Sequence, residues 1–414
     1  MKFLRTASTG RLLAVLTGVV IAIVAGTAIA IAAGGSGPVP KAKPLAQSLH
    51  SALTARPVSG ISADIQFTNN LISSTNFTGG SRDPILQGAT GRLWISKANG
   101  LRLELQSPNG DSQVMVNNSR FWVSDPSSQT VYEGTIPAGS GKTPAKAKKA
   151  AAGSGVPTVA QIQTGLDHLL GHADVAGAKT SNPSDIAGQP AYSVRVSPKH
   201  DGGLLGSAQI AWDAITGTPL NLAIYARGNS TPVLQLKVTN ISFGSVSPST
   251  FALTPPAGYK VVKVSTPASH ASAPSAKAKK AKHVAGVAAV AHAVPFRLAA
   301  PAKLVGLPRQ STTLLDWGGH PAALVTYGQG LGGIAIIQQK ADSAASSTTG
   351  QGSSSNSGSG NLSLPSVSIN GATGTELSTA LGTVLRYTSG GVSYTVLGSV
   401  QPFVAEQAAK ALTP

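Results

Sequence analysis

The sequence of 414 residues contains no cysteine, only 15 acidic residues against 32 lysines and arginines, and 5% aromatic residues. Without cysteine there is no disulfide framework, no thiolate metal site, no cysteine nucleophile and no thioether-linked lipid anchor. Charged residues make up 11% of the chain and hydrophobic residues 41%, which excludes an acidic or polyampholyte disordered protein. The 47 glycines and 27 prolines predict long irregular connections between folded parts.

The positive charge is concentrated outside the segments that are expected to fold. Of the formal net charge of +17, thirteen charges lie in segments without acidic neighbours, within residues 1–44, 142–149 and 277–282, which leaves +4 for the rest. This distribution argues against nucleic acid as a partner. The basic segments are interpreted either as solvated spacers or as tethers that touch anionic lipid head groups or other anionic envelope polymers.

An uncharged segment near the N-terminus predicts a membrane anchor. Residues 12–33 are 22 residues without a charge, and Lys2, Arg5 and Arg11 precede them. This length suffices for one transmembrane helix, and the positive-inside rule places residues 1–11 in the cytoplasm and the bulk of the chain outside the cytoplasmic membrane. A signal peptide cleaved after Ala30, which would release a secreted protein, is the alternative.

Composition also divides the remainder of the chain into parts. A linker at 34–44 leads to a first domain at 45–264, which a Lys-rich disordered insertion at about 138–156 interrupts. A disordered basic linker at 265–293 then leads to a C-terminal α+β domain at 294–414 with a Ser/Gly loop at 343–360. In this second domain, residues 323–339 and 383–400 each predict a strand pair, and residues 402–412 predict a helix.

Strict alternation of apolar and polar residues predicts that the first domain is mainly an antiparallel sheet with one dry face. The alternation is clear at residues 61–67, 93–108, 192–196 and 234–238. Two amphipathic helices are expected at 44–55 and 157–172, the second with a capping box of Thr158 and Gln161. The pattern alone does not distinguish a filled β-sandwich from a half-barrel that encloses a cavity.

Several short phrases of the first domain occur in a familiar order and spacing. They are Leu93–Trp94, Lys97–Ala98–Asn99, Leu101–Pro108 and Phe121–Trp122 followed by Asp125–Pro126, and "STFALTPPAGYKVV" at 249–262 closes the series. Together they resemble the LolA lipoprotein-carrier family over about residues 45–264. The resemblance implies a mainly β fold with α elements (α+β), an incomplete antiparallel β-barrel that a helical lid closes over a hydrophobic cavity for acyl chains.

The resemblance also implies roles for particular residues. The side chains expected to line the cavity are Ile65, Phe67, Leu93, Ile95, Leu101, Leu103 and Leu105. The apolar side chains expected on the lid are Leu49, Leu53, Ile162, Leu166 and Leu169.

Lys97 stands where the family carries a gate arginine that bonds the lid backbone. Lysine lacks the planar, five-donor group of arginine, so a gate of the same geometry is not expected. Its alternation with Leu93 and Ile95 places Lys97 on the dry face, where it would need a carbonyl or a ligand head group as partner. The alternative is a lysine at a hairpin end that extends its ammonium group into water.

No motif predicts catalysis. His168 and His172 have a spacing that can seat zinc, but no third ligand is apparent, so a solvated polar edge is the preferred interpretation. "GQGLGG" at 328–333 matches a dinucleotide-binding pattern but lies between two predicted strands, which favours a hairpin turn. We therefore expect a protein that is not an enzyme and that holds neither metal nor cofactor.

Two hypotheses for the function remain open. The first is a membrane-tethered carrier of lipid or lipoprotein acyl chains. The second is a regulatory sensor similar to RseB, which uses a LolA-like domain and a second domain to act on an anti-sigma factor. The C-terminal region resembles extracytoplasmic domains that accompany anti-sigma factors and LolA-type proteins in high-GC Gram-positive bacteria, such as the actinobacteria.

Overall fold

A computed structural model describes residues 39–72, 84–135, 156–264, 284–341 and 364–412, apart from residues 99, 109, 118–119, 127, 201, 253 and 318–319. The predicted anchor at 12–33 and the loop at 343–360 lie outside the described residues, as does the Lys-rich insertion up to residue 155. Among the described residues, no helix has both the length and the apolar character needed to cross a bilayer.

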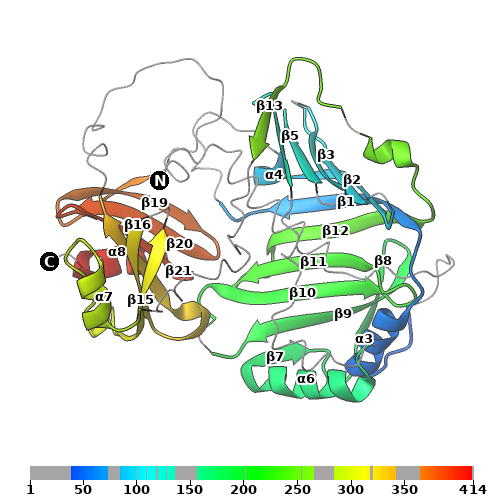
Figure 1. Cartoon of the computed structure of the whole chain (residues 1–414). Coiled ribbons are helices and arrows are strands. Elements are labelled where there is room, and N and C mark those ends of the chain that lie inside the picture. The colour runs from blue at the N-terminus through cyan, green and yellow to red at the C-terminus, as the bar shows by residue number, and fades with distance from the viewer. Residues whose placement is uncertain are drawn as a thin grey trace, which may run out of the picture.

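A curled sheet of thirteen strands forms the larger part of the molecule (Figure 1). Its order is β13-β6-β5-β4-β3-β2-β1-β12-β11-β10-β9-β7, and β8 also pairs with β9. The strands are β1 (Gly60–Asn69), β2 (Gly88–Ser96), β3 (Gly100–Leu105), β4 (Ser112–Asn117), β5 (Arg120–Asp125), β6 (Thr130–Thr135), β7 (Ala173–Ala176), β8 (Asn182–Ile186), β9 (Gln189–Pro198), β10 (Leu205–Asp213), β11 (Pro219–Ala226), β12 (Pro232–Phe243) and β13 (Lys260–Val264). The predicted mainly β fold with a half-barrel sheet is confirmed.

Two helices cover one end of this sheet. Helix α3 (Leu45–Thr54) packs on helix α6 (Val159–His172), and both contact the side chains of Tyr192 and Trp212 from β9 and β10. The predicted capping box is present, because the Thr158 hydroxyl accepts from the Gln161 amide at 3.3 Å and the Gln161 side chain accepts from the Thr158 amide at 2.9 Å. A third, one-turn helix, α4 (Pro84–Gln87), contacts β1 and β2.

The last strand differs from the expected antiparallel arrangement. After β12, the chain passes over the opposite face of the sheet through the short helix η2 (Pro248–Phe251), and β13 then pairs with β6 in parallel. We call residues 244–252 and 254–259 the strap. The Arg102 guanidinium donates to the carbonyl oxygen of Thr250 in the strap at 3.0 Å and to the Glu104 carboxylate at 2.9 Å. The strap reverses the direction in which the chain reaches β6, and this makes the final pairing parallel.

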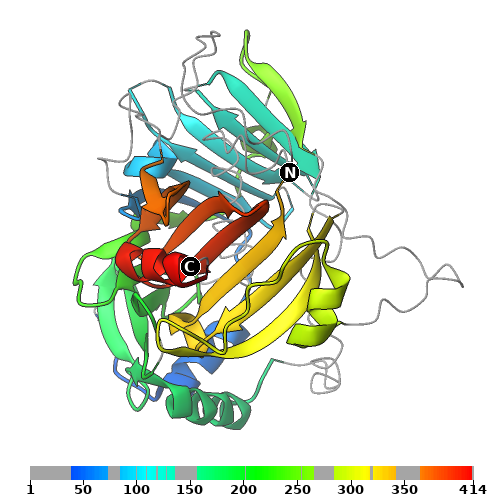
Figure 2. The same ribbon diagram turned by 90° about the vertical axis from the view of Figure 1, so that its left-hand side faces the viewer.

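A second sheet has eight strands in the order β14-β15-β16-β17-β21-β20-β19-β18. Helix α8 (Pro402–Leu412) packs against one face of it, as Figure 2 shows, and buries Ala405, Ala408 and Ala409 completely. The strands are β14 (Lys303–Leu304), β15 (Leu307–Trp317), β16 (His320–Tyr327), β17 (Ile334–Lys340), β18 (Ser366–Ile369), β19 (Ala372–Thr379), β20 (Gly382–Ser389) and β21 (Val392–Gly398). Both predicted strand pairs and the predicted terminal helix are present.

The linker predicted at 265–293 is too long at its C-terminal end. Ala285 forms a bridge with Thr313, and helix α7 (Val287–Ala293) packs on β15 with Val290 fully buried. The Ala-rich composition of this segment concealed the apolar contacts of Val290 and Val294. Residues 284–293 therefore belong to the second folded part.

We expect Glu104→Ala to destabilise the large sheet by about 3 kcal/mol, because the mutation leaves Arg102 without its buried counter-ion. The side chains of Glu104 and Arg102 are 8% and 18% exposed. Arg92 also contacts Glu104, at 3.4 Å, but its side chain is 51% exposed, so Arg92→Ala is the matched control and should change the free energy of unfolding by less than about 1 kcal/mol. Denaturant unfolding followed by tryptophan fluorescence measures both values, and equal effects would contradict the role of Glu104.

Candidate functional site

The face of the large sheet under α3, α4 and α6, here called the inner face, is apolar along most of its width. Strand register brings side chains from neighbouring strands into rows across this face. The deep row comprises Ala63, Leu93, Leu103, Val114 and Val123. The rim row lies two residues further along each strand, on the side of the β2–β3 turn. It comprises Phe243, Ile61, Ile95, Leu101, Val116 and Phe121.

The deep part of the inner face is filled by the protein's own side chains. Leu93, Leu103 and Leu105 are 7%, 6% and 2% exposed, and Ile65 and Phe67 are buried beside them. Ile85 of α4 and the β8–β9 turn at Ile186 and Ala187 pack against the same cluster. These five predicted cavity residues therefore form the packed core of the sheet.

Two stretches of the inner face keep exposed apolar surface. In the rim row, Ile95, Leu101, Val116, Phe121 and Phe243 are only partly buried. In the middle of the sheet, partly buried residues pair across β10, β11 and β12, and they are Ile210, Leu222, Ile224, Leu234 and Leu236. Room for a guest molecule on this face would lie along these stretches.

Lys97 lies in the turn that joins β2 to β3, at the edge of the rim row, and is exposed. Its backbone amide donates to the carbonyl oxygen of Ser59 at 3.4 Å, while its side chain makes no hydrogen bond or ion pair with a described residue. Its ammonium group therefore stands in water beside apolar surface. The predicted gate role stays a prediction.

The predicted lid residues gather at the β9–β10 end of the inner face. Leu166 is buried, and Leu49, Ile162 and Leu169 pack around it, against Tyr192, Val194 and Trp212. Leu53 differs, because its side chain is 45% exposed and points away from this cluster. The Tyr192 hydroxyl also donates to the carbonyl oxygen of Lys41 at 2.7 Å, which attaches the chain ahead of α3 to the sheet.

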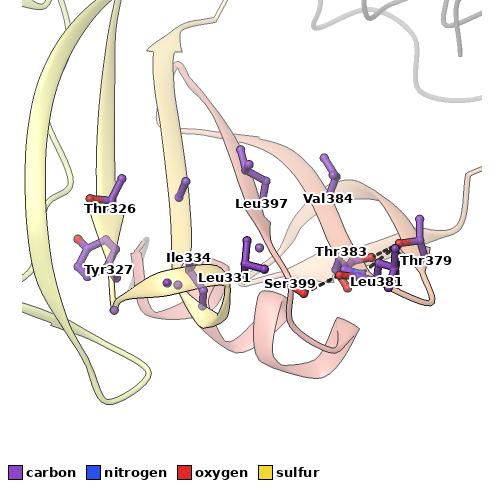
Figure 3. Close-up of a pocket in the computed structure, with 16 residues that line it drawn as sticks. Thr326, Tyr327, Leu331, Ile334, Thr379, Leu381, Thr383, Val384, Leu397 and Ser399 are labelled. Atoms are coloured by element: carbon purple, nitrogen blue, oxygen red, sulfur yellow. Dashed lines mark hydrogen bonds between the residues drawn. The ribbon is translucent and has the colours of Figure 1, made fainter. Parts of the chain in front are cut away.

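A pocket of about 480 Å³ lies in the second sheet, where β16 and β21 end and β17 and β20 begin (Figure 3). Leu331, Val384 and Leu397 supply apolar side chains, and none of the 16 residues that line the pocket is charged. The hydroxyls of Thr379, Thr383 and Ser399 donate to backbone carbonyl groups of the same fold at 2.7–2.8 Å. The pocket therefore suits an apolar group, and its volume lies in the range of small-molecule sites.

The same corner of the second sheet contacts the large sheet. The backbone amide of Leu204 donates to the carbonyl oxygen of Ser399 at 3.0 Å and lies 2.9 Å from the Ser399 hydroxyl. The backbone amide of Ala380 donates to the carbonyl oxygen of Leu71 at 2.8 Å. Because Thr379, Leu381 and Ser399 line the pocket, the pocket and the contact between the sheets share one corner.

Burial raises the pKa of three acidic groups of the second sheet, Glu376, Tyr327 and Tyr394. Burial, and secondarily the Glu406 carboxylate on α8, raises the pKa of Glu376, whose side chain is almost fully covered. Burial raises the pKa of Tyr327 to about 12 against the opposing effect of Arg309, so its phenol stays protonated.

The other motifs adopt structural roles. His168 and His172 lie on the exposed side of α6 with ring centroids 5.4 Å apart, and no cluster of three metal-ligating side chains occurs among the described residues. The glycine-rich residues 328–333 form a hairpin connection with the short helix η3 (Gly330–Gly332), as the sequence predicts.

Comparisons with known proteins find structural similarity at low sequence identity. No protein-family model matches the chain, and no curated protein matches it. The complex of Pseudomonas aeruginosa MucA and MucB matches with 15% identity and a TM-score of 0.38, over 88% of this chain and 95% of the other. A LolA superfamily protein of Nitrosomonas europaea, NE2245, matches with 9% identity and a TM-score of 0.20, over 51% and 98%. An uncharacterised conserved protein of Thermus thermophilus matches with 8% identity and a TM-score of 0.31, over 53% and 97%. At these values the similarity assigns neither a family nor a function to the chain.

We expect Gly203→Ala to separate the two sheets. Gly203 has a φ of +59°, and an added methyl group would lie 2.6 Å from the Cβ atom of Ser399. Gly188→Ala is the matched control, because Gly188 has a φ of +74° with nothing within 4 Å of the added group, so it carries only the backbone strain of about 1 kcal/mol. Hydrogen exchange at the Leu204 and Ala380 amides should accelerate in Gly203→Ala alone.

We expect Glu376→Gln to stabilise the second sheet at neutral pH. The pKa of Glu376 is raised above its ordinary value of 4.5 in the folded protein, so the unfolded chain loses its proton at lower pH than the folded chain. The protonated side chain therefore makes its full contribution to the free energy of unfolding below pH 4.5. This contribution is lost as the pH rises through the pKa that Glu376 has in the folded protein. Denaturant unfolding across this range should show a flatter pH profile for Glu376→Gln than for the parent protein, and equal profiles would contradict the prediction.

Proposed function

We propose that the chain binds the acyl chains of lipids or lipoproteins along the inner face of the large sheet. One observation carries this proposal: an apolar face that spans most of thirteen strands keeps two partly exposed stretches, the rim row and the middle of the sheet. Burial of each methylene group there contributes about 0.8 kcal/mol. A guest that covers these stretches needs no polar contact to bind, so selectivity for a head group would be low.

The proposal assigns different roles to the predicted cavity residues. Leu93, Leu103 and Leu105 maintain the curvature and packing of the sheet, whereas Ile95 and Leu101 contact the guest. Lys97 stands at the end of the rim row, where an exposed ammonium group can meet an anionic head group. The protein acts outside the cytoplasmic membrane, tethered by residues 12–33, and needs no catalytic residue, metal or cofactor.

A sensor similar to RseB, which acts on an anti-sigma factor, is the second candidate. The shared corner favours it, because Ser399 both lines the apolar pocket and accepts from Leu204 of the large sheet. A ligand in the pocket would press on the contact between the sheets. MucB, one of the structurally similar proteins, is bound to MucA in its crystal structure.

Lipid binding tests the first candidate. Residues 39–414, prepared without detergent, should carry a bound lipid in native mass spectrometry and should release a fluorescent fatty-acid probe when competing fatty acids are added. Competitor affinity should rise about fourfold with each added methylene group, as expected for burial in an apolar site. Absence of bound lipid together with no probe displacement at any chain length would reject the proposal.

Substitution on the two faces of the large sheet locates the site. We expect Leu101→Gln to weaken probe binding about tenfold, because it removes apolar contact in the rim row. Val261→Gln is the matched control, because Val261 is 43% exposed on the opposite face of the same sheet and should not affect the probe. Equal effects of the two variants would place the probe elsewhere.

Recovery of partners from membranes discriminates between the two candidates. A tagged full chain that recovers an anti-sigma factor, released when fatty acid is added, would support the sensor. Recovery of lipoproteins alone would support the carrier.

A further inference from the structure

Four exposed apolar side chains gather at the corner of the molecule where α3 ends and α6 begins. Leu53, Val156, Val159 and Ile215 are 45%, 44%, 39% and 46% exposed, and together they are called the corner patch. Single exposed apolar side chains are ordinary on a protein surface, whereas a group of them marks a contact surface. Figures 1 and 2 both place α3 and α6 at the bottom of the molecule.

Contacts between three segments bring these residues together. The His50 ring nitrogen Nδ1 lies 2.9 Å from the carbonyl oxygen of Pro157, so Leu53, one turn after His50, lies near Val156 and Val159. The turn between β10 and β11 touches the end of α3, because a methyl group added at Gly217 would lie 2.5 Å from the carbonyl oxygen of Ala52. Ile215 belongs to this turn, which lies at the same end of α3 as Leu53.

The charges around the corner patch are basic. Lys41, Lys43 and Arg56 flank α3, and residues 39–60 contain no acidic residue. The acidic residue of the adjoining turn, Asp213, is 1% exposed, and its carboxylate accepts from the backbone amide of Ile215 at 2.9 Å. Apolar side chains within a basic rim match a bilayer that contains anionic lipids.

The chain also has the right length to hold this corner at a membrane. The predicted anchor ends at residue 33, and the described chain begins at Val39, six residues later. Six extended residues reach about 20 Å at most. The Tyr192 hydroxyl then binds the carbonyl oxygen of Lys41, which places the point of attachment beside α3.

We propose that the corner patch lies on the outer surface of the cytoplasmic membrane and inserts Leu53, Val156, Val159 and Ile215 among anionic lipids. The lipid surface then faces the end of the large sheet that α3 and α6 cover. This orientation is independent of whether the inner face binds acyl chains.

Single-cysteine labelling tests the proposal in the full chain, which has no native cysteine. Leu53→Cys, Val159→Cys and Ile215→Cys, each carrying a fluorophore, are reconstituted in vesicles of phosphatidylcholine and phosphatidylglycerol. Phe403→Cys is the matched control, because Phe403 is 64% exposed on α8 of the second sheet. A nitroxide attached to the lipid acyl chain should quench the three corner labels several-fold more than the Phe403 label, and less in vesicles without phosphatidylglycerol.

Equal quenching of the corner labels and the Phe403 label overturns the proposal. Shielding of the corner labels from a water-soluble quencher without quenching by lipid also overturns it, because that result indicates a protein contact. Each labelled variant must keep the melting temperature of the parent. Leu101→Gln combined with a corner label separates this proposal from acyl-chain binding, because it should lower probe binding and leave lipid quenching unchanged.

Discussion

The burial of one apolar face along thirteen strands governs the architecture of the large sheet. The apolar side chains of this face are removed from water only if the sheet curls and other elements cover its ends. Exposure of an apolar face of this width to water is costly in free energy. The chain provides α3 and α6 at the β9–β10 end and α4 over β1 and β2, and the β8–β9 turn packs against the same apolar cluster as α4. The rim row and the middle strands are where this coverage is incomplete, and the proposed binding site follows from that incompleteness.

The opposite face shows how a polar face can also be buried. The strap crosses β3, and Arg102 and Glu104 lie beneath it as a bonded pair, with the Arg102 guanidinium 5.3 Å from the centre of the Trp94 ring. The guanidinium of Arg102 donates to the Glu104 carboxylate, the Thr250 backbone and the Gln113 side chain, while its Nε atom has no hydrogen-bond partner among the described residues. The strap thus joins the last strand to the sheet through directional polar contacts, whereas the inner face relies on packing.

Local patterns predicted the local structure well. Period-two alternation located β1, β3, β9 and β12, and the capping box located the start of α6. Three features depended on contacts distant in sequence and were missed. The alternation in "LRLEL" predicts that Arg102 and Glu104 lie on a solvent-exposed face. Nothing in the sequence reveals that the strap passes over this face. The parallel pairing of β13 and the contact of Leu204 with Ser399 have no local signal for the same reason.

Helix geometry explains why Leu53 lies apart from the other residues that were predicted for the lid. Each step of four residues in a helix turns about 40° beyond a full circle, so Leu53 is about 80° away from Leu45 around α3. Leu45 therefore packs on the sheet while Leu53 points outward. For the residues predicted to line the cavity, the sequence identified which side chains share one face of the sheet. It did not indicate how deeply each row is buried, because burial depends on what packs above the row.

The pairing of β1 with β12 has a consequence for how the protein reaches this structure. Ile61 lies opposite Phe243, so the centre of the large sheet joins segments that emerge far apart during synthesis. Until β12 has been synthesised, β1 presents an unpaired edge and an uncovered apolar face beside it. Such long-range pairing closes slowly and favours association between incomplete chains. A short tether that keeps emerging chains apart on a membrane would limit that association, so the proposed anchor would assist folding as well as position.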